Sequence, residues 1–394
     1  MNAASKGRIA LLYDCTYPHM PGGGQKRLYE VFRRLVAKGW QVDWYGMKTW
    51  DGDDDPVIEG IRYISVAPAR QLYGPNGKRL ILQTVRYGMA IARFPKIGRY
   101  DIVHMGQWPY FHFFPVWIFT RLGGARTSVD WWEVWGSSWR SYYGLKGYVG
   151  MALERVCSRL AGRLVAISET GRRELEDIGV NANRITVIHN GIDFSAIQSA
   201  PIGDQAADLV YLGRLQPHKN VDLLIEALAL LKRRGQILTL AIIGDGPERL
   251  SLERLAVENG VSAQISWLGA IEDDADVYAA LCASRVFVHP STKEGGGSIT
   301  SLEANAAGLP VVAFSVPGGI SPELIIQNQN GMWVSKFDVT ALAEVIADTI
   351  ALNEGGGSNA QAISFAQNFD WDGITNQYDE MFDEQLSRAR QSPA

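Results

Sequence analysis

The segment KEGGGSITSLEA, residues 293–304, places Glu294 and Glu303 on either side of a glycine run and a group of small polar residues. Three uses of such a segment compete: a flexible loop, a loop that binds phosphate, and the substrate site of an enzyme. A helix-like pattern follows the glycines, and the N-terminus of a helix offers unpaired N–H groups to an anion. The segment alone does not decide between the three uses, and the rest of the sequence has to choose.

Two cations stand in GRLQPHKN, residues 213–220, between a predicted strand and a predicted helix. Arg214 offers a planar fork and Lys219 a compact charge, a combination that suits a diphosphate. Cations are unfavourable at the start of a helix, and an anionic ligand would remove that conflict. The alternative is that both are ordinary surface charges.

Two further glycine-rich turns follow predicted strands. The first, PGGG at residues 21–24, includes Gly23 and Gly24, and the second, GDG, begins at Gly244. Glycine lets the backbone approach a ligand closely. The first turn is neither GxGxxG nor a Walker loop, so a dinucleotide-dependent dehydrogenase loses support. A plain strand-to-helix turn is the alternative for the first of them.

These loops depend on two series of apolar strands that alternate with helical patterns. The first series begins at residues 8–13 and the second at residues 209–215, with few periodic residues from 194 to 207. Such alternation predicts parallel sheets covered by helices on both faces, which bind ligands at the carboxyl ends of their strands. We therefore predict an α/β protein with two Rossmann-like, doubly wound domains, residues 1–195 and 207–370, followed by a helix from Trp371.

Composition narrows the class further. The 394 residues are 46% hydrophobic and 20% charged, as in a globular protein. Three cysteines far apart in the sequence argue against a disulfide framework and suit a reducing cytoplasm. No CxxC spacing for a metal is present, and the apolar stretch 109–119 is too short to span a bilayer. The sequence predicts a soluble, cytoplasmic or at most peripheral protein.

The net charge of −4 conceals an asymmetry. Residues 1–195 contain 26 Lys and Arg against 17 Asp and Glu, whereas residues 196–394 contain 12 against 25. A basic first half suits an anionic acceptor or the inner leaflet of a membrane. The alternative is ordinary surface solvation.

The longest motif, VHPSTKEGGGSITSLEANAAGLPVVAF at residues 288–314, resembles the donor-site signature of retaining GT-B glycosyltransferases of family 4, the glycosyl transferases group 1. Six other segments agree with that family in order and spacing, and the resemblance runs from residue 8 to the terminal helix. They are GGG at 22–24, AIS at 166–168, VIHNGID at 187–193, GRL with HKN at 213–220, GDGPE at 244–248 and PGG at 317–319.

The resemblance implies a GT-B fold, two Rossmann-like domains that face a central cleft. The first domain would bind the acceptor, the second the nucleotide-sugar donor, and helix 371–390 would pack back on the first domain. The implied reaction moves a sugar from a UDP- or GDP-linked donor to a glycan, a lipid-linked or a small-molecule acceptor in bacterial surface polysaccharide or glycolipid assembly. No cofactor, metal ion or nucleic acid partner is implied.

The resemblance also implies roles for individual residues. Arg214 and Lys219 would hold the diphosphate and stabilise the leaving group. Glu303 would accept hydrogen bonds from the ribose hydroxyls, and Glu294 would contact the sugar beside its reacting carbon. The remaining donor-binding residues are backbone groups around the phosphates, namely Gly23, Gly24, Gly244, Gly296, Gly297, Ser298 and Ile299.

Two features depart from the family pattern. Eight residues separate Glu294 from Glu303 where the family has seven, so the extra residue is expected to bulge near Gly295. Trp132 stands where many relatives carry a histidine. Trp131, Trp132 and Glu133 could form a wall for the acceptor or sugar, or the tryptophans could pack a core.

Other functions stay open at this point. A nucleotide-sugar epimerase or hydrolase of the same fold, and a non-catalytic protein that binds nucleotide sugars, both fit the motifs. The histidines His19, His104 and His112 are alternatives for a proton carrier. The acidic runs 51–55 and 272–276 are interpreted as solvated loops, not as metal sites.

Overall fold

The structure is a computed structural model that describes residues 5–20, 22–53, 55–71, 80–204, 206–294, 296–353 and 359–391. The chain divides into two compact units. One contains the residues up to His189 together with those from Asp372 onward, and the other runs from Asn190 to Trp371. We describe each unit by itself.

The first unit is built on an eight-stranded sheet in the order β3-β4-β2-β1-β5-β6-β7-β8. All its recorded pairings are parallel except β3 with β4. The strands are β1 (Gly7–Leu12), β2 (Trp40–Lys48), β3 (Val57–Ile58), β4 (Ile61–Pro68), β5 (Ile102–Gly106), β6 (Arg126–Trp131), β7 (Arg163–Ala166) and β8 (Ile185–Val187).

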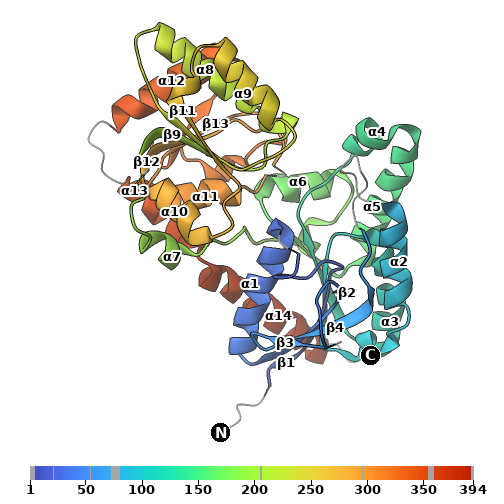
Figure 1. The fold of residues 1–394 in the computed structure, drawn as a ribbon. Helices are drawn as coiled ribbons and strands as arrows, with labels where there is room; N and C mark the ends of the chain where they lie inside the picture. The colour runs from blue at the N-terminus through green and yellow to red at the C-terminus, as the bar shows by residue number, and fades with distance from the viewer. Residues whose placement is uncertain are drawn as a thin grey trace. The chain divides into compact units, whose positions relative to one another are not determined.

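Helices cover both faces of this sheet (Figure 1). Side chains from α2, α3 and α5 share one core with the strands, and α1 and α14 lie on the other face. The predicted apolar face of α1, Leu28 to Leu35, is buried. The helices are α1 (Gly23–Ala37), α2 (Ile81–Ile91), α3 (Phe113–Gly123), α4 (Ser138–Tyr143), α5 (Gly147–Leu160), α6 (Glu169–Asp177) and α14 (Trp371–Gln391).

The second unit has a six-stranded sheet with parallel pairing throughout, in the order β11-β10-β9-β12-β13-β14. Figure 1 shows α8, α9 and α12 on one face and α10, α11 and α13 on the other. The strands are β9 (Ala207–Leu212), β10 (Leu240–Ile243), β11 (Ile265–Gly269), β12 (Ser284–His289), β13 (Val311–Phe314) and β14 (Gly331–Val334). The helices are α7 (Phe194–Gln198), α8 (Val221–Arg233), α9 (Arg249–Glu258), α10 (Asp274–Cys282), α11 (Ile299–Ala306), α12 (Val339–Leu352) and α13 (Ala360–Ala366).

Strand order fixes where each sheet can bind a ligand. The order reverses between β1 and β5 in the first sheet and between β9 and β12 in the second. Ligands of doubly wound sheets bind outside the carboxyl ends of the strands at such switch points. Attention therefore falls on the loops that follow β1 and β5, and on those that follow β9 and β12.

The chain passes between the units earlier than the sequence pattern suggested. We expected the first domain to extend to residue 195, but Ile192 and Ile197 pack in the core of the second unit. The N–H of Ile192 donates to the carbonyl of Phe369 at 2.9 Å. This backbone pairing explains why the division falls at residue 190.

The terminal helix α14 packs within the first unit. The ring of Phe382 lies 6.2 Å from Phe32 of α1 and 5.8 Å from Trp40. Asp379 accepts a hydrogen bond from the Trp40 indole at 2.8 Å and pairs with Lys6 at 2.8 Å. These contacts tie the end of the chain to its first helix and strands. In the described part of the chain, every helix is too short or too polar to cross a membrane.

A buried ionic network joins α1, β6 and α14. Arg27 is 1% exposed, and its Nε donates to Asp130 at 2.9 Å. Its other nitrogens donate to the carbonyls of Ile188 at 2.7 Å and His189 at 2.5 Å, and to the Tyr378 hydroxyl at 2.8 Å. The Tyr378 hydroxyl in turn donates to Asp130 at 2.5 Å. Four chain segments far apart in sequence therefore depend on one guanidinium.

The same network keeps Asp130 ionised. Burial alone would raise the pKa of the Asp130 carboxyl, but Arg27, His104 and Tyr378 more than offset burial and lower the pKa to about 2. Nε2 of His104 lies 3.2 Å from Asp130, and Nδ1 lies 2.8 Å from the Ser128 hydroxyl. His104 is fully buried, and its ring joins β5 to β6 within this network.

We predict that Arg27→Met destabilises the protein by about 3–5 kcal/mol, because it leaves the Asp130 carboxylate buried without its main counter-charge. The midpoint of urea unfolding, followed by tryptophan fluorescence, measures the change. Arg33→Met on the same helix is the control. Arg33 is partly exposed and pairs with Glu30 one turn away, so the control should change stability by less than about 1 kcal/mol. Equal effects of the two changes would contradict the role given to Arg27.

The low pKa of Asp130 predicts how its contribution varies with pH. Aspartate in an unfolded chain titrates near pH ~3.9. Because folding depresses the pKa of Asp130 to about 2, its stabilisation is complete above pH ~4 and is lost as pH falls through about 2. The difference in thermal midpoint between wild type and Asp130→Asn should therefore shrink on acidification from pH 6 to pH 2. The exposed Asp51, changed to Asn, should show no such trend.

Candidate active site

The loops after β9 and β12 are fastened to each other at the switch point of the second sheet. The N–H of Thr292 donates to the carbonyl of His218 at 3.1 Å. The Asn220 amide donates to the carbonyl of Pro290 at 2.9 Å, and its backbone is left-handed at φ 50°. The end of the segment 213–220 therefore lies beside the residues that precede the segment 293–304.

Glu294 has two nitrogen neighbours at this point. Nζ of Lys219 is in direct contact with Oε1 of Glu294, and Nε2 of His289 lies 3.0 Å from the same oxygen. Burial would raise the pKa of Glu294, but His289 and Lys219 outweigh burial and hold the pKa well below its usual range. Glu294 is therefore a largely buried carboxylate that stays ionised.

His289 was not selected by the sequence analysis. It is the last residue of β12, it is 2% exposed, and its Nδ1 has no hydrogen-bond partner among the described residues. A polar residue that ends a buried apolar strand immediately before Pro290 and Ser291 was the available signal. Its side chain occupies the carboxyl end of the strand, where ligands of this sheet type bind.

Arg214 follows β9, and its side chain is exposed with no ionic partner among the residues that the structure describes. Its loop is positioned by close packing of two glycines. The N–H of Gly213 donates to Ile243 at 3.0 Å, and that of Gly244 donates to Gly269 at 2.7 Å. A Cβ on Gly244 would lie 2.0 Å from the carbonyl oxygen of Gly213. Gly244 therefore has a positioning role for the Arg214 loop.

The glycine run leads into α11. Gly296 has φ 85°, and its carbonyl accepts from Ser321 at 2.9 Å. The N–H of Gly297 donates to the carbonyl of Glu294 at 3.2 Å, so in this structure it is engaged within the loop and not offered to a phosphate. Ser298 caps α11, and its hydroxyl accepts from the N–H of Ser301 at 3.3 Å.

The other expected residues of this segment lie on α11 or just before it. Ile299 is the first residue of α11, and Glu303 is 8% exposed in the middle of the helix. Gly295, where the extra residue was expected to bulge, lies outside the described residues. The glutamate pair is thus divided between a loop carboxylate and a helix carboxylate.

The switch point of the first sheet is covered by Trp132. Its ring meets that of Tyr13 edge-on, with centroids 5.2 Å apart. A Cβ on Gly24 would lie 3.1 Å from the Trp132 ring, and one on Gly106 would lie 2.9 Å from it. Gly23 and Gly24 begin α1, and the absence of a side chain at Gly24 makes room for this tryptophan.

Trp131 does not fit the expected wall. It is 1% exposed and packs in the core with Tyr110 and Phe113, so no face of its ring is open to a sugar. Trp132 and Glu133 are half-buried in the following loop. The alternative of core packing is correct for Trp131.

Glu133 belongs to a group of carboxylates around that loop. Its carboxylate accepts from the Trp135 indole at 2.5 Å. Glu154, which is buried, accepts from the N–H groups of Trp135 and Gly136, both at 2.9 Å. Burial, together with the charges of Glu133 and Glu154, raises the pKa of Glu174 to about 7. Glu174 can therefore exchange a proton near neutral pH, a property that its sequence context did not reveal.

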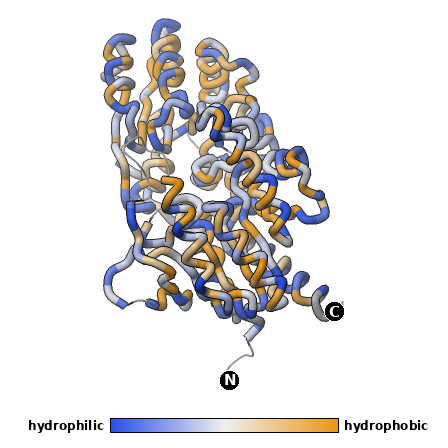
Figure 2. The backbone as a smooth tube through the Cα atoms, turned by 90° about the vertical axis from the view of Figure 1, so that its right-hand side faces the viewer, coloured by the Kyte–Doolittle hydropathy of each residue, from blue (hydrophilic) through white to orange (hydrophobic). Residues whose placement is uncertain are grey.

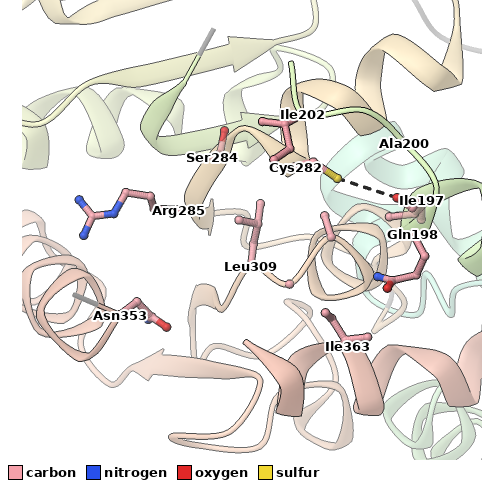
Figure 3. A pocket seen from close by; sticks show the side chains of 12 residues that line it. Ile197, Gln198, Ala200, Ile202, Cys282, Ser284, Arg285, Leu309, Asn353 and Ile363 are labelled. Atoms are coloured by element: carbon pink, nitrogen blue, oxygen red, sulfur yellow. Dashed lines mark hydrogen bonds between the residues drawn. The ribbon is translucent and has the colours of Figure 1, made fainter. Parts of the chain in front are cut away.

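The candidate site residues form neither a metal site nor part of the pocket in Figure 3. Among the described residues, no group of three or more His, Cys, Asp or Glu is arranged to hold a metal ion. The pocket in Figure 3 has a volume of about 340 Å³ and is lined by Ser284 and Arg285, which begin β12, and by Leu309 before β13. It lies at the amino ends of these strands and includes none of the candidate donor-binding residues.

The remaining predicted histidines have structural surroundings. His112 is fully buried against Tyr87 and Phe113. His19 lies beside Trp50 and Tyr63, and burial lowers its pKa. Both lie in the segments that follow β1 and β5, where their rings pack against aromatic side chains.

Comparison with known proteins gives one family match for each of the two units. Residues 194–369 match the family described as glycosyl transferases group 1, and residues 22–191 match the glycosyl transferase 4-like domain. A glycogen synthase from Mycobacterium tuberculosis H37Rv is 28% identical over 338 residues, which cover 80% of this chain and 78% of that protein.

Two further comparisons concern a shorter region and the fold. A GDP-mannose-dependent alpha-(1-6)-phosphatidylinositol monomannoside mannosyltransferase from Mycolicibacterium smegmatis is 35% identical over 156 residues, 38% of this chain and 40% of that protein. Sucrose-phosphate synthase from Thermosynechococcus elongatus superposes with a TM-score of 0.76 at 20% identity, over 97% of this chain and 100% of that one. The fold and the two family matches together place this chain among the GT-B glycosyltransferases.

Proposed function

We propose that the protein is a retaining glycosyltransferase of family 4 that transfers a sugar from a UDP- or GDP-linked donor without a metal ion. The observation that carries the proposal is the contact of Lys219 and His289 with an ionised Glu294 at the switch point of the second sheet. These side chains come from both loops at which a doubly wound sheet binds its ligand.

The donor diphosphate would be bound by Arg214 and Lys219. Arg214 is exposed and has no ionic partner among the described residues, so a diphosphate would supply its counter-charge. The N-terminus of α11 adds a favourable dipole for the same anion. As the glycosidic bond breaks, negative charge grows on the departing diphosphate, and these groups stabilise it more strongly than the ground state.

Glu294 would act on the sugar. Positive charge develops at the anomeric carbon during transfer, and a carboxylate that is held ionised in a mostly buried position stabilises such charge. Lys219 and His289 keep Glu294 ionised and fix its position. In a retaining reaction on one face of the sugar, the departing phosphate helps to deprotonate the acceptor, so no separate base is required.

Glu303 would accept hydrogen bonds from the ribose hydroxyls of the donor. On the acceptor side, Trp132 would offer an aromatic face and Glu133, the next residue, a carboxylate. Glu174, whose pKa the charge of Glu133 helps to raise, would add a second carboxyl group. The acceptor would be a glycan, a lipid-linked molecule or a small molecule. The name of the mannosyltransferase relative, which specifies a phosphatidylinositol glycoside, supports the lipid-linked class. For such an acceptor we propose a cytoplasmic enzyme that acts at the inner membrane face.

We predict that Arg214→Ala and Lys219→Ala each lower kcat/KM for transfer by about 10²–10³-fold, because each removes a cation that faces the departing diphosphate. Thermal shifts with UDP, GDP and ADP identify the base first, since a bound ligand stabilises the folded protein. The matched control is Arg233→Ala at the far end of α8, which should retain wild-type turnover.

Near-normal transfer by both site variants would reject the assignment. Consumption of the donor without any acceptor, with release of free or epimerised sugar, would instead favour a hydrolase or an epimerase. Tight binding of a nucleotide sugar without turnover on any acceptor extract would favour a non-catalytic binding protein.

Glu294→Gln separates catalysis from donor binding. The change removes the negative charge but keeps the shape of the side chain, and it releases Lys219 for the diphosphate. We expect kcat to fall at least ~100-fold while the Kd for the nucleoside diphosphate stays within about threefold of wild type. Calorimetric titration with the diphosphate and a transfer assay measure the two quantities. A parallel loss of binding and of kcat would show that Glu294 only holds Lys219 in place.

A further inference from the structure

A pocket in the first unit is lined by arginines and lies away from both switch points. Its volume is about 800 Å³, and none of its lining residues is acidic. Arg126 begins β6 and Arg163 begins β7, so the pocket lies at the amino ends of these strands. Trp132 follows the carboxyl end of β6. The pocket therefore lies at the opposite end of that strand from the proposed acceptor residues. Its arginines are Arg121, Arg126, Arg159, Arg163, Arg184 and Arg388.

One of these arginines serves the fold. Arg184 donates to the carbonyl of Ser158 at 3.0 Å and to that of Gly162 at 3.1 Å. Burial lowers the pKa of Arg184, because the guanidinium is partly removed from water and no carboxylate offsets that loss. Arg184 thus fixes the floor of the pocket and adds an uncompensated positive charge to it.

The other arginines differ in how open they are to a ligand. Arg163 is only 16% exposed and donates to the Thr186 hydroxyl at 3.2 Å. Arg126 and Arg159 are exposed and have no side-chain partner among the described residues. Arg163 and Arg388 share Glu384 as their nearest carboxylate, at 3.9 Å and 3.7 Å, and that side chain is itself 60% exposed. Guanidinium groups pair with phosphate oxygens through two parallel hydrogen bonds. A pocket with this excess of guanidinium groups is suited to a phosphate group.

An exposed apolar face borders the pocket on α3. Trp117 lines the pocket, and the guanidinium of Arg121 lies 4.7 Å from the centre of its ring. Phe114, Ile118 and Leu122 follow one another at helical spacing beside Trp117, and Leu122 is 83% exposed. The apolar face is therefore continuous with the rim of the arginine pocket.

The neighbouring helices extend this face. Tyr148, Val149 and Val156 are exposed on α5, as are Leu82 and Met89 on α2. Figure 1 shows α2, α3 and α5 together on one face of the first sheet. Figure 2 looks toward that side, and hydrophobic stretches alternate there with hydrophilic ones.

The charge on these helices has a single sign at the surface. Residues 80–99, 113–124 and 138–160 contain nine Lys and Arg and one carboxylate, Glu154. Glu154 is 1% exposed and is bound to the N–H groups of Trp135 and Gly136. An acidic aqueous partner would match the cations but not the exposed apolar side chains. A membrane that contains anionic lipid matches both.

We propose that this face docks on an anionic membrane, with the arginine pocket holding a lipid phosphate and the apolar side chains of α3 entering the headgroup boundary. Docking would bring the enzyme to a lipid-linked acceptor, and this consequence rests on the proposed function. The docking itself requires neither donor nor transfer and is tested without them.

The test is co-sedimentation of the full-length protein with vesicles of phosphatidylcholine, with and without phosphatidylglycerol. Wild type should bind only the anionic vesicles, and added salt should weaken the binding. Arg126→Gln combined with Arg159→Gln should weaken it about thirtyfold, since each basic residue near an anionic surface contributes about a factor of five. Ile118→Ser combined with Leu122→Ser should also weaken binding.

Arg233→Gln combined with Arg254→Gln is the matched control, because it removes the same charge from exposed positions of the second unit. Thermal midpoints and thermal shifts with UDP or GDP should be unchanged in all variants, which separates failure of docking from failure of the donor site. Equal vesicle binding by the pocket variant and the control would overturn the proposal.

Two other results would also overturn it. Binding of inorganic phosphate or glycerol 3-phosphate in the pocket without any vesicle binding would identify a site for a free phosphate compound. Binding of polyglutamate but not of anionic vesicles would identify a surface for an acidic protein.

Discussion

The cost of burying a carboxylate governs both units of this protein. A charge removed from water is tolerated only when opposite charge and hydrogen bonds replace the solvent. Asp130 in the first unit and Glu294 in the second are both ionised, and in each case burial is outweighed by cationic neighbours. The positions of Arg27, Lys219 and His289 follow from that requirement.

The two carboxylates differ in how completely they are enclosed. Asp130 has Arg27 and Tyr378 as hydrogen-bond partners and His104 close by, all of them buried, so its network is closed and serves stability. Glu294 lies in a loop that Asn220 and the backbone of Gly318 hold in place, with the exposed Arg214 on the neighbouring loop. A closed network stabilises a fold, whereas a cation left exposed beside a buried ion pair can receive a ligand.

Much of the fold and part of the site could be predicted from the sequence, because they depend on local pattern. Apolar strands alternating with helices predicted both sheets, and the loops of Lys219 and Glu294 were predicted to converge because parallel strands end at one edge. Arg27, Asp130 and Tyr378 were missed because their contacts join residues 103 to 351 positions apart. No local pattern reports such contacts. His289 was missed for a related reason. Its partner Glu294 lies in a glycine-rich loop, and the conformation of such a loop cannot be predicted from the sequence.

The alternation of side chains along a strand could have predicted that Trp131 and Trp132 have different surroundings. Successive side chains of a strand point to opposite faces, so Trp131 and Trp132 could not both face a ligand. Trp131 ends β6 and packs in the core, and Trp132 turns out beside Tyr13 and Gly24.

The charge of the surface formed by α2, α3 and α5 could not be predicted from the sequence, because composition does not show which charged residues are buried. The first half of the sequence has an excess of cations, but the sequence does not locate them on one surface. The structure shows that Glu154, the single carboxylate of three neighbouring helices, is buried. A sum of charges treats that glutamate as the equal of any surface arginine. Its burial leaves the surface of α2, α3 and α5 with cations alone, so this surface is more basic than the composition of its residues indicates.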